Sequence, residues 1–173
     1  MLIVIGMDNT GKTTLVESLC KSMKLGSIKS PGPIPEPQQK EWVLQQIANT
    51  KEHALDKIYE RFPIFEEVVY GNVLRGKSNF QFNDNYYSLL KKSGPIIIYT
   101  RPSNEIIFNF GSREQFPGVI EQKEKLLAAY DALTLRLLVE GWNLIIYDYV
   151  YNEDIKALTF TLNMMSDLGG LMK

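Results

Sequence analysis

The sequence predicts an α/β fold in which a parallel five-stranded sheet carries helices on both faces. Short apolar segments of strand type alternate with helical segments along the chain, which is typical of a parallel sheet covered by helices. The run Ile96-Ile97-Ile98-Tyr99 is continuously apolar, as expected of a central strand that is buried on both faces. With 173 residues and no internal repeat, the chain is expected to form a single domain.

The first predicted strand, Leu2–Ile5, is followed by a loop and then by a helix over Lys12–Met23, in which apolar residues recur at helical spacing. Turn residues and hydrophobic patterns place the later elements: strands at residues 27–29, 54–59, 96–99 and 142–147, and helices at 38–49, 65–74, 83–92, 119–140 and 153–165. A proline-rich loop over residues 30–37 ends the second strand, and Gly141 ends the longest helix.

A phosphate-binding loop opens the chain. Residues 6–13 form the complete pattern G-x-x-x-x-G-K-[ST] and read Gly6-Met7-Asp8-Asn9-Thr10-Gly11-Lys12-Thr13. The loop lies between a predicted strand and a predicted helix, which is the context that the motif requires. Glycines let the backbone curl around a polyphosphate, Lys12 adds a cation, and Thr13 can bind Mg²⁺. We therefore expect the chain to bind a nucleoside triphosphate.

The composition excludes several classes of protein. The net charge of −1 argues against a broad non-specific nucleic-acid surface. No stretch is long and apolar enough to span a membrane, and the single cysteine, Cys20, leaves no disulfide framework within the chain. These features predict a cytoplasmic protein without a membrane partner.

Ligands of open parallel sheets bind beyond the carboxyl ends of the strands, so residues that follow a predicted strand are candidates for the site. Arg61 and Arg101 each lie at such an end, and Arg113 lies in a polar segment between two helices. Arginine suits bidentate phosphate binding and neutralises charge on a transferring phosphoryl group. We therefore expect these three arginines to be functional, whereas Arg75 and Arg136 are interpreted as surface ion pairs.

Two acidic residues accompany these arginines. Glu60 ends the third predicted strand, where a carboxylate can order water around Mg²⁺ or act as a base toward an incoming hydroxyl. The alternative is a carboxylate that simply pairs with Arg61 or Lys57. Asp8, inside the phosphate loop, either caps the following turn or points toward a sugar hydroxyl of the acceptor.

Several motifs resemble those of the thymidylate kinases, a family of P-loop kinases. The opening loop, extended by Thr14, is similar to the family's Gly-x-Asp-x-x-Gly-Lys-Thr-Thr sequence. The other matching segments follow in the family's order over nearly the full length: Ser30-Pro31-Gly32-Pro33 for Glu-Pro-Gly-Gly, Glu60-Arg61-Phe62 for Asp-Arg-Tyr, Tyr70-Gly71 near a downstream aromatic, and Ser112-Arg113-Glu114-Gln115 at an arginine-bearing lid. The whole chain looks closest to thymidylate-kinase-like proteins encoded by phages, and for a phage-encoded chain this resemblance implies the cytoplasm of a host cell.

The resemblance implies a P-loop kinase fold with a small lid at residues 109–119, and ATP and Mg²⁺ bound by residues 6–14. Together with the strand-end residues, it predicts a set of roles. Lys12, Arg101 and Arg113 neutralise the transferring phosphoryl group, and Thr13 and Glu60 hold Mg²⁺. The acceptor contacts Asp8, Ser30, Pro31 and Gly32, with its phosphate held by Arg61 and its base site lined by Phe62 and Tyr70. Three departures from the family, at Ile5, Pro33 and Glu60, concern the acceptor more than phosphoryl transfer.

Three functions remain open. The preferred one is an ATP-dependent kinase of a pyrimidine deoxynucleoside monophosphate. The second is a kinase with a hydroxyl acceptor, either a deoxynucleoside or 5-hydroxymethyluracil within DNA; Glu60 as a base favours it, and the near-neutral charge disfavours a polymer substrate. The third is an ATP-dependent switch without a small acceptor, which the Glu-Arg pair and the lid-like arginine disfavour. Thymidylate kinases are commonly dimers, so the resemblance also implies a homodimer.

Overall fold

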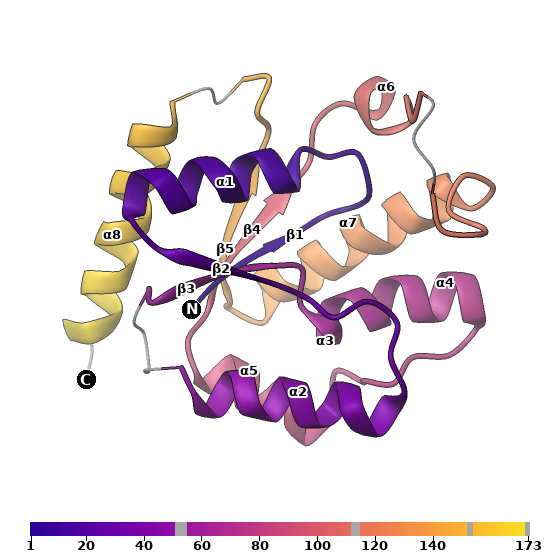
Figure 1. Cartoon of the computed structure of the whole chain (residues 1–173), viewed down its shortest axis with the longest axis horizontal. Helices are drawn as coiled ribbons and strands as arrows, with labels where there is room; N and C mark the ends of the chain where they lie inside the picture. Colours follow the sequence, from indigo (N-terminus) through magenta and orange to yellow (C-terminus); the bar gives the residue numbers. More distant parts are fainter. Residues whose placement is uncertain (51–54, 112–114, 152–153, 172–173) are drawn as a thin grey trace.

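The computed structural model describes residues 1–50, 55–111, 115–151 and 154–171. Its strands form one parallel sheet in the order β2-β3-β1-β4-β5 (Figure 1). The strand bounds are β1 Leu2–Ile5, β2 Gly26–Lys29, β3 Lys57–Glu60, β4 Ile96–Thr100 and β5 Asn143–Tyr147. The predicted α/β fold with a parallel five-stranded sheet is therefore confirmed.

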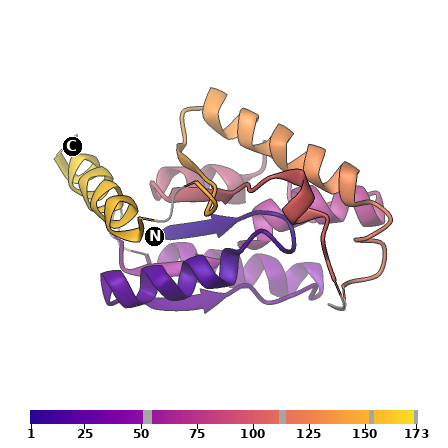
Figure 2. The same cartoon turned by 90° about the horizontal axis from the view of Figure 1, so that it is seen from above.

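Helices cover both faces of this sheet, and Figure 2 shows α7 and α1 on opposite sides of β1. One face carries α1 (Lys12–Met23) and α8 (Ile155–Leu171), and the other carries α2 (Glu36–Ala48), α3 (Pro63–Glu66), α5 (Asn85–Lys92) and α7 (Lys123–Val139). Side chains alternate between the faces of a strand, so Leu2 and Val4 pack toward α1 whereas Ile3 and Ile5 pack toward α7. β1, the middle strand of the sheet, is thus buried on both faces. β4, whose continuously apolar sequence predicts such burial, is also buried along its whole length.

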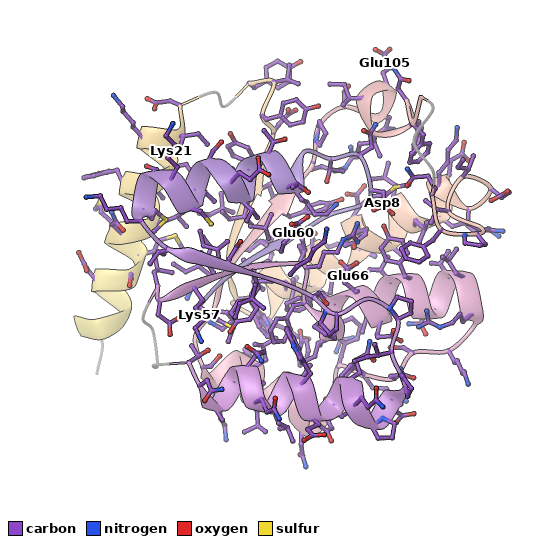
Figure 3. All side chains as sticks on the ribbon, in the orientation of Figure 1. Asp8, Lys21, Lys57, Glu60, Glu66 and Glu105 are labelled. Carbon is purple, nitrogen blue, oxygen red and sulfur yellow. The ribbon has the colours of Figure 1, made fainter. Side chains whose placement is uncertain are left out.

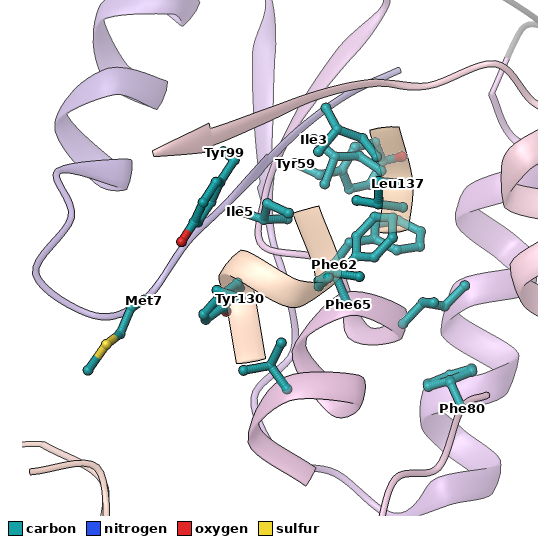
Figure 4. Close-up of a cluster of buried hydrophobic side chains, with 14 of the residues drawn as sticks. Ile3, Ile5, Met7, Tyr59, Phe62, Phe65, Phe80, Tyr99, Tyr130 and Leu137 are labelled. Atoms are coloured by element: carbon teal, nitrogen blue, oxygen red, sulfur yellow. The ribbon is translucent and has the colours of Figure 1, made fainter. Parts of the chain in front are cut away.

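The larger of the two cores contains Phe62, which corrects one prediction of the sequence. Phe62 is fully buried, and its ring centroid lies 5.6 Å from that of Trp42 and 5.5 Å from that of Tyr59. Figure 4 shows it within the apolar cluster beside Phe65. Phe62 therefore packs in the core and does not line a base site.

The helix predicted at residues 65–74 is three consecutive segments. After α3 the chain makes a π-helical turn, η1 (Glu67–Gly71), and then a short α-helix, α4 (Asn72–Arg75). A Cβ on Gly71 would lie 2.7 Å from the carbonyl oxygen of Lys77 and 2.9 Å from the Glu67 carboxylate. Only glycine fits at this position, and π turns of this kind are frequent at functional sites.

Other boundaries differ by a few residues. The helix predicted at residues 119–140 begins at Lys123 because residues 119–122 form turns, and β3 ends at Glu60, one residue later than predicted. The short helix α6 (Asn104–Ile107) has no counterpart in the predicted elements. Residue 54 of the third predicted strand, residues 112–114 of the predicted lid and residue 153 of the last predicted helix lie outside the described residues. In the described parts of the chain, no helix has both the length and the apolar character needed to cross a bilayer.

Candidate functional site

The phosphate loop joins β1 to α1 and relies on its two glycines. Gly6 has φ +147°, and a Cβ there would clash with Thr100 Oγ1 and lie 2.9 Å from the Thr100 carbonyl oxygen. Gly11 has φ +78°, and its added Cβ would lie 3.0 Å from the ring of Tyr149. The Thr10 hydroxyl donates to the carbonyl oxygen of Met7 at 2.8 Å and contacts Thr100 Oγ1 at 2.6 Å. These contacts hold the loop in a curled shape at the carboxyl end of β1.

Asn9 fixes the outer part of the loop to a distant segment. It adopts the left-handed conformation, with φ 65°, which asparagine tolerates better than most residues. Its Nδ2 donates to the carbonyl oxygens of Ile106 and Asn109, each at 2.7 Å. The phosphate loop is therefore hydrogen-bonded to α6 and to the chain directly after it.

Lys12 is folded back onto the loop that carries it. Its ammonium donates to the carbonyl oxygen of Met7, and the residue is 5% exposed. Burial, reinforced by the nearby guanidinium of Arg61, lowers the pKa of Lys12 to about 7. A polyphosphate beside it would favour the charged form, so the loop holds a lysine that is ready to take up a proton with its ligand.

Thr13 and Glu60 meet between α1 and β3. The Thr13 hydroxyl donates to Glu60 Oε1 at 2.6 Å, and both residues line the same cavity. A hydroxyl and a carboxylate are the hard oxygen ligands that Mg²⁺ prefers. Among the described residues, no cluster of three or more His, Cys, Asp or Glu side chains forms a metal cage. The pair therefore fits a cation that takes its remaining ligands from phosphate and water.

Arg61 is the centre of an ion-pair network directly after β3. Its backbone is left-handed, with φ 68°, and its N–H donates to the carbonyl oxygen of Val4 at 2.9 Å. Its guanidinium pairs with Asp8 on one side and with Glu66 on the other. Figure 3 shows Asp8, Glu60 and Glu66 gathered between α1 and α4, whereas Lys21 and Glu105 lie at the periphery. A strained backbone conformation at a partly buried arginine is typical of a functional position.

Two tyrosines complete this network. Tyr70 donates to Asp8 Oδ2 at 2.8 Å, and Tyr130 donates to Glu66 Oε1 at 2.6 Å. Burial raises the pKa of both phenols, which therefore remain neutral donors. Burial alone would raise the pKa of Asp8, but the charges of Arg61 and Lys12 and the bond from Tyr70 hold it below its usual range. Asp8 is therefore ionised at neutral pH.

A cavity of about 820 Å³ extends from the phosphate loop across Arg61 to the π turn. Its volume lies in the range of small-molecule sites. Its lining comes from five parts of the fold: the phosphate loop with Thr14, the loop after β2, one side chain of α2, the segment from Glu60 to Arg75, and Phe116 with Pro117. One cavity thus joins the anion-binding loop to a second polar end.

Comparison with solved structures finds proteins whose fold is similar to that of this chain. The YorR protein from Bacillus subtilis in complex with phosphorylated GDP matches with a TM-score of 0.70 at 16% identity, over 94% of this chain and 95% of that chain. Deoxyadenosine kinase from M. mycoides with bound dCTP gives 0.59 at 20% identity, over 95% and 100% of the two chains. A gluconokinase from Sinorhizobium meliloti 1021 gives 0.56 at 10% identity, over 99% and 96%.

The chain has the P-loop kinase fold. At these identities the similarity concerns the fold alone. Neither the models of known protein families nor the sequences of curated proteins match this chain. The resemblance to thymidylate kinases therefore rests on the sequence motifs and stays a prediction.

Most of the residues predicted for the site lie on this cavity of the P-loop kinase fold. They are Asp8, Asn9, Thr10, Gly11, Lys12, Thr13, Thr14, Ser30, Pro31, Gly32, Glu60, Arg61 and Tyr70. Gly6 and Met7 belong to the phosphate loop but do not line the cavity, and Met7 is fully buried. Phe62 lies in the core, and Arg113 lies outside the described residues.

The Arg101 side chain contacts α7 and does not line the cavity, where its predicted role would place it. Its guanidinium forms two hydrogen bonds to the carboxylate of Asp131 on α7, at 3.0 and 3.2 Å, and a third to the carbonyl oxygen of Pro102 at 2.8 Å. Arg101 is not among the residues that line the cavity. Its catalytic role stays a prediction, and in this conformation the side chain serves to join β4 to α7.

Sequence reasoning missed five polar residues of the cavity: Lys29, Gln39, Glu66, Glu67 and Arg75. Arg75 forms an ion pair, as expected, but its partner Glu67 is buried at the cavity and not on the open surface. Two adjacent glutamates soon after the third strand were a usable signal, since that strand end already carried Glu60 and Arg61. Gln39 carried no signal because its neighbours on α2 are ordinary surface residues.

Proposed function

We propose that this protein transfers the γ-phosphate of ATP to a pyrimidine deoxynucleoside monophosphate. The observation that carries the proposal is the single cavity that connects the phosphate loop to an end containing Arg61, Tyr70 and Arg75. The P-loop kinase fold supports a phosphotransferase, because every similar structure named above except YorR is described as a kinase. The thymidylate-kinase-like motifs support the choice of acceptor.

The donor half consists of the phosphate loop, Lys12, Thr13 and Glu60. Backbone N–H groups of the loop and the positive end of α1 bind the polyphosphate, and Lys12 leaves the Met7 carbonyl to contact it. Thr13 and Glu60 provide the oxygen ligands for Mg²⁺. When bound, Mg²⁺ would neutralise charge on the β- and γ-phosphates.

The acceptor half is organised by Arg61. An oxygen of the acceptor monophosphate forms a new bond to the γ-phosphorus, and the bond from that phosphorus to the β–γ bridging oxygen breaks, so that ADP leaves. The acceptor is already ionised and needs no base, so this chain contributes position and positive charge. Asp8 is held as an anion beside Arg61 and, in this proposal, accepts a hydrogen bond from the deoxyribose hydroxyl.

A hydroxyl acceptor is the second candidate, and one observation favours it. Arg61 is already paired with two carboxylates, Asp8 and Glu66, which reduces its attraction for a dianionic phosphate. A hydroxyl of a deoxynucleoside, or of hydroxymethyluracil in DNA, would attack the same phosphorus and give its proton to a carboxylate. Glu60, the base that the sequence suggests for a hydroxyl acceptor, lines the same cavity.

Labelled ATP separates these candidates. The protein would be incubated with γ-labelled ATP and Mg²⁺ beside deoxynucleoside monophosphates, deoxynucleosides, and DNA with or without hydroxymethyluracil. Label in a pyrimidine diphosphate is the expected result. Label only in a deoxynucleoside or in the modified DNA would replace the first candidate by the second, and label in free phosphate alone would contradict both.

The role of Arg61 has its own test. Arg61→Lys keeps one positive charge but loses the forked geometry, so it should raise the acceptor KM at least about tenfold and leave the KM for ATP nearly unchanged. Arg136→Lys is the matched control, since Arg136 pairs with Glu140 on the far end of α7. Equal effects of Arg61→Lys on both KM values would contradict the assignment.

A further inference from the structure

The part of the cavity lined by Gln39 of α2 and by the π turn contains a buried carboxylate. Glu67 is 5% exposed and lines the cavity together with Gln39, which is 3% exposed. Glu67 Oε1 accepts a hydrogen bond from Gln39 Nε2 at 3.2 Å. Glu67 Oε2 pairs with Arg75 and accepts a bond from the backbone N–H of Asn79 at 3.4 Å. The two oxygens of this carboxylate therefore have different surroundings.

Stability alone is a poor explanation for this carboxylate. Its neighbours along the chain, Phe65 and Val69, are fully buried in the apolar core. Removing a carboxylate from water is costly, and a buried ion pair generally stabilises a fold no better than apolar side chains of similar size. A ligand explains an acidic residue at this position better than stability does.

The backbone around Glu67 is also specialised. Glu67 begins the π turn, and Gly71 ends it. Because a Cβ on Gly71 would approach Glu67 Oε2 to 2.9 Å, the missing side chain of Gly71 leaves the space that the carboxylate occupies. The turn and the glycine together hold Glu67 at the wall of the cavity.

Both side chains line the cavity and have hydrogen-bonding capacity left. In the described part of the chain, Gln39 Nε2 donates one of its two N–H groups, to Glu67, while Gln39 Oε1 accepts from Asn79 Nδ2 at 3.0 Å. Among the described residues, Glu67 Oε1 accepts that one bond from a side chain, although a carboxylate oxygen can accept two. The cavity wall therefore presents one acceptor and one donor, whose heavy atoms are 3.2 Å apart.

We propose that Glu67 and Gln39 read the base of the acceptor. An adjacent acceptor and donor match a base edge on which an N–H lies beside a carbonyl oxygen or a ring nitrogen, as side-chain amides match adenine in DNA. Glu67 Oε1 accepts the N–H of the base, and Gln39 Nε2 donates to the neighbouring atom. The acceptor is thus a nucleotide whose pyrimidine carries an unsubstituted N–H on its hydrogen-bonding edge. This inference rests on the proposed function for the identity of the acceptor.

Methylated bases test the inference on the wild-type protein. Binding of thymidine monophosphate and its N3-methyl derivative, and of deoxycytidine monophosphate and its N4,N4-dimethyl derivative, would be measured by titration calorimetry without ATP. Methylation removes the N–H and leaves the second acceptor position of Glu67 Oε1 buried without a hydrogen bond, so the better-bound nucleotide should lose at least about tenfold in affinity. Equal binding of a nucleotide and its methylated form overturns the inference, and so does the absence of binding by both unmodified nucleotides.

A substitution assigns the effect to Glu67. In Glu67→Gln, Arg75 and the Asn79 N–H keep the amide oxygen on their side, so the amide NH₂ takes the place of Oε1 and donates where the wild-type residue accepts. The ratio of affinities for native and methylated nucleotides should then fall to about one, while ATP affinity is unchanged. Glu36→Gln, an exposed change on the same helix as Gln39, should keep the wild-type ratio.

A purely structural role for Glu67 gives a different result: the midpoint of thermal unfolding falls, and the ratio of affinities stays at its wild-type value. The same nucleotides are then tested with labelled ATP. If the protein binds native nucleotides more tightly than methylated ones but transfers no label to either, the proposed function is refuted and the inference is kept. Transfer to native and methylated nucleotides at equal rates would keep the function and refute the inference.

Discussion

The buried lysine of the phosphate loop leads to a quantitative prediction about protons. With a pKa of about 7, Lys12 is mostly neutral in the empty protein at slightly alkaline pH. Contact with the polyphosphate stabilises the ammonium form, so ATP binding must be accompanied by proton uptake. For a bound lysine that is fully protonated, the uptake is about 0.8 proton at pH 7.5 and about 0.2 proton at pH 6.5.

Titration calorimetry measures this uptake directly. Mg²⁺·ATP binding would be followed at each pH in two buffers of different ionisation enthalpy, and the dependence of the observed heat on that enthalpy gives the number of protons. Lys12→Met should abolish the uptake wherever binding remains measurable. Lys21→Met, which removes an exposed lysine from the same helix, should leave it unchanged. Uptake near zero at pH 7.5 in the wild-type protein would refute the argument.

The same protonation affects folding. The unfolded chain keeps Lys12 protonated up to its ordinary pKa, whereas the empty folded protein releases this proton near pH 7. Between these two values the unfolded state binds more protons, so this residue makes the free energy of unfolding rise with pH over that interval. Urea denaturation of the empty protein at several pH values checks the direction, with Lys12→Met as the variant in which the dependence should decrease.

Three further predictions concern single residues. Phe62→Leu should lower the free energy of unfolding by about 1–2 kcal/mol in urea and leave the acceptor KM unchanged, because the ring packs in the core; a raised KM with normal stability would restore it to the base site. Gly6→Ala should lower the free energy of unfolding by about 2 kcal/mol or more and weaken ATP binding, because the added Cβ collides with Thr100. Gly26→Ala is the control, since a Cβ there meets open space, and equal effects of the two substitutions would contradict the geometry. Arg101→Ala should lower stability by about 1 kcal/mol and keep kcat/KM within about threefold, because its guanidinium is held in an ion pair on α7; a larger kinetic loss would support the catalytic role predicted from sequence.

The parts of the site that the sequence predicted are those fixed by short stretches of chain. The phosphate loop is one continuous motif between a strand and a helix, so its pattern determines its place. Glu60 and Arg61 were found because the carboxyl ends of parallel strands meet at one edge of the sheet. The pairing of Thr13 with Glu60 follows from the same rule, since β1 and β3 are neighbours.

The errors arose where the backbone departs from regular geometry. Phe62 follows Arg61 directly, but the left-handed backbone at Arg61 lets that arginine enter the cavity while Phe62 turns into the core. The π turn depends on space that Gly71 leaves for Glu67, and no local pattern encodes that contact. Gln39 reaches the cavity only because α2 packs beside α3. The homodimer and the cytoplasmic location stay predictions of the sequence.

The bonds from Asn9 to the carbonyl oxygens of Ile106 and Asn109 tie two segments that are almost one hundred residues apart in the chain. Any ligand that rearranges the phosphate loop changes the free energy of these bonds. By reciprocity, any event that displaces the residues after α6 changes the affinity of the loop for its ligand by the same factor. Asn9 thereby couples nucleotide binding thermodynamically to the position of α6 and of the chain that follows it.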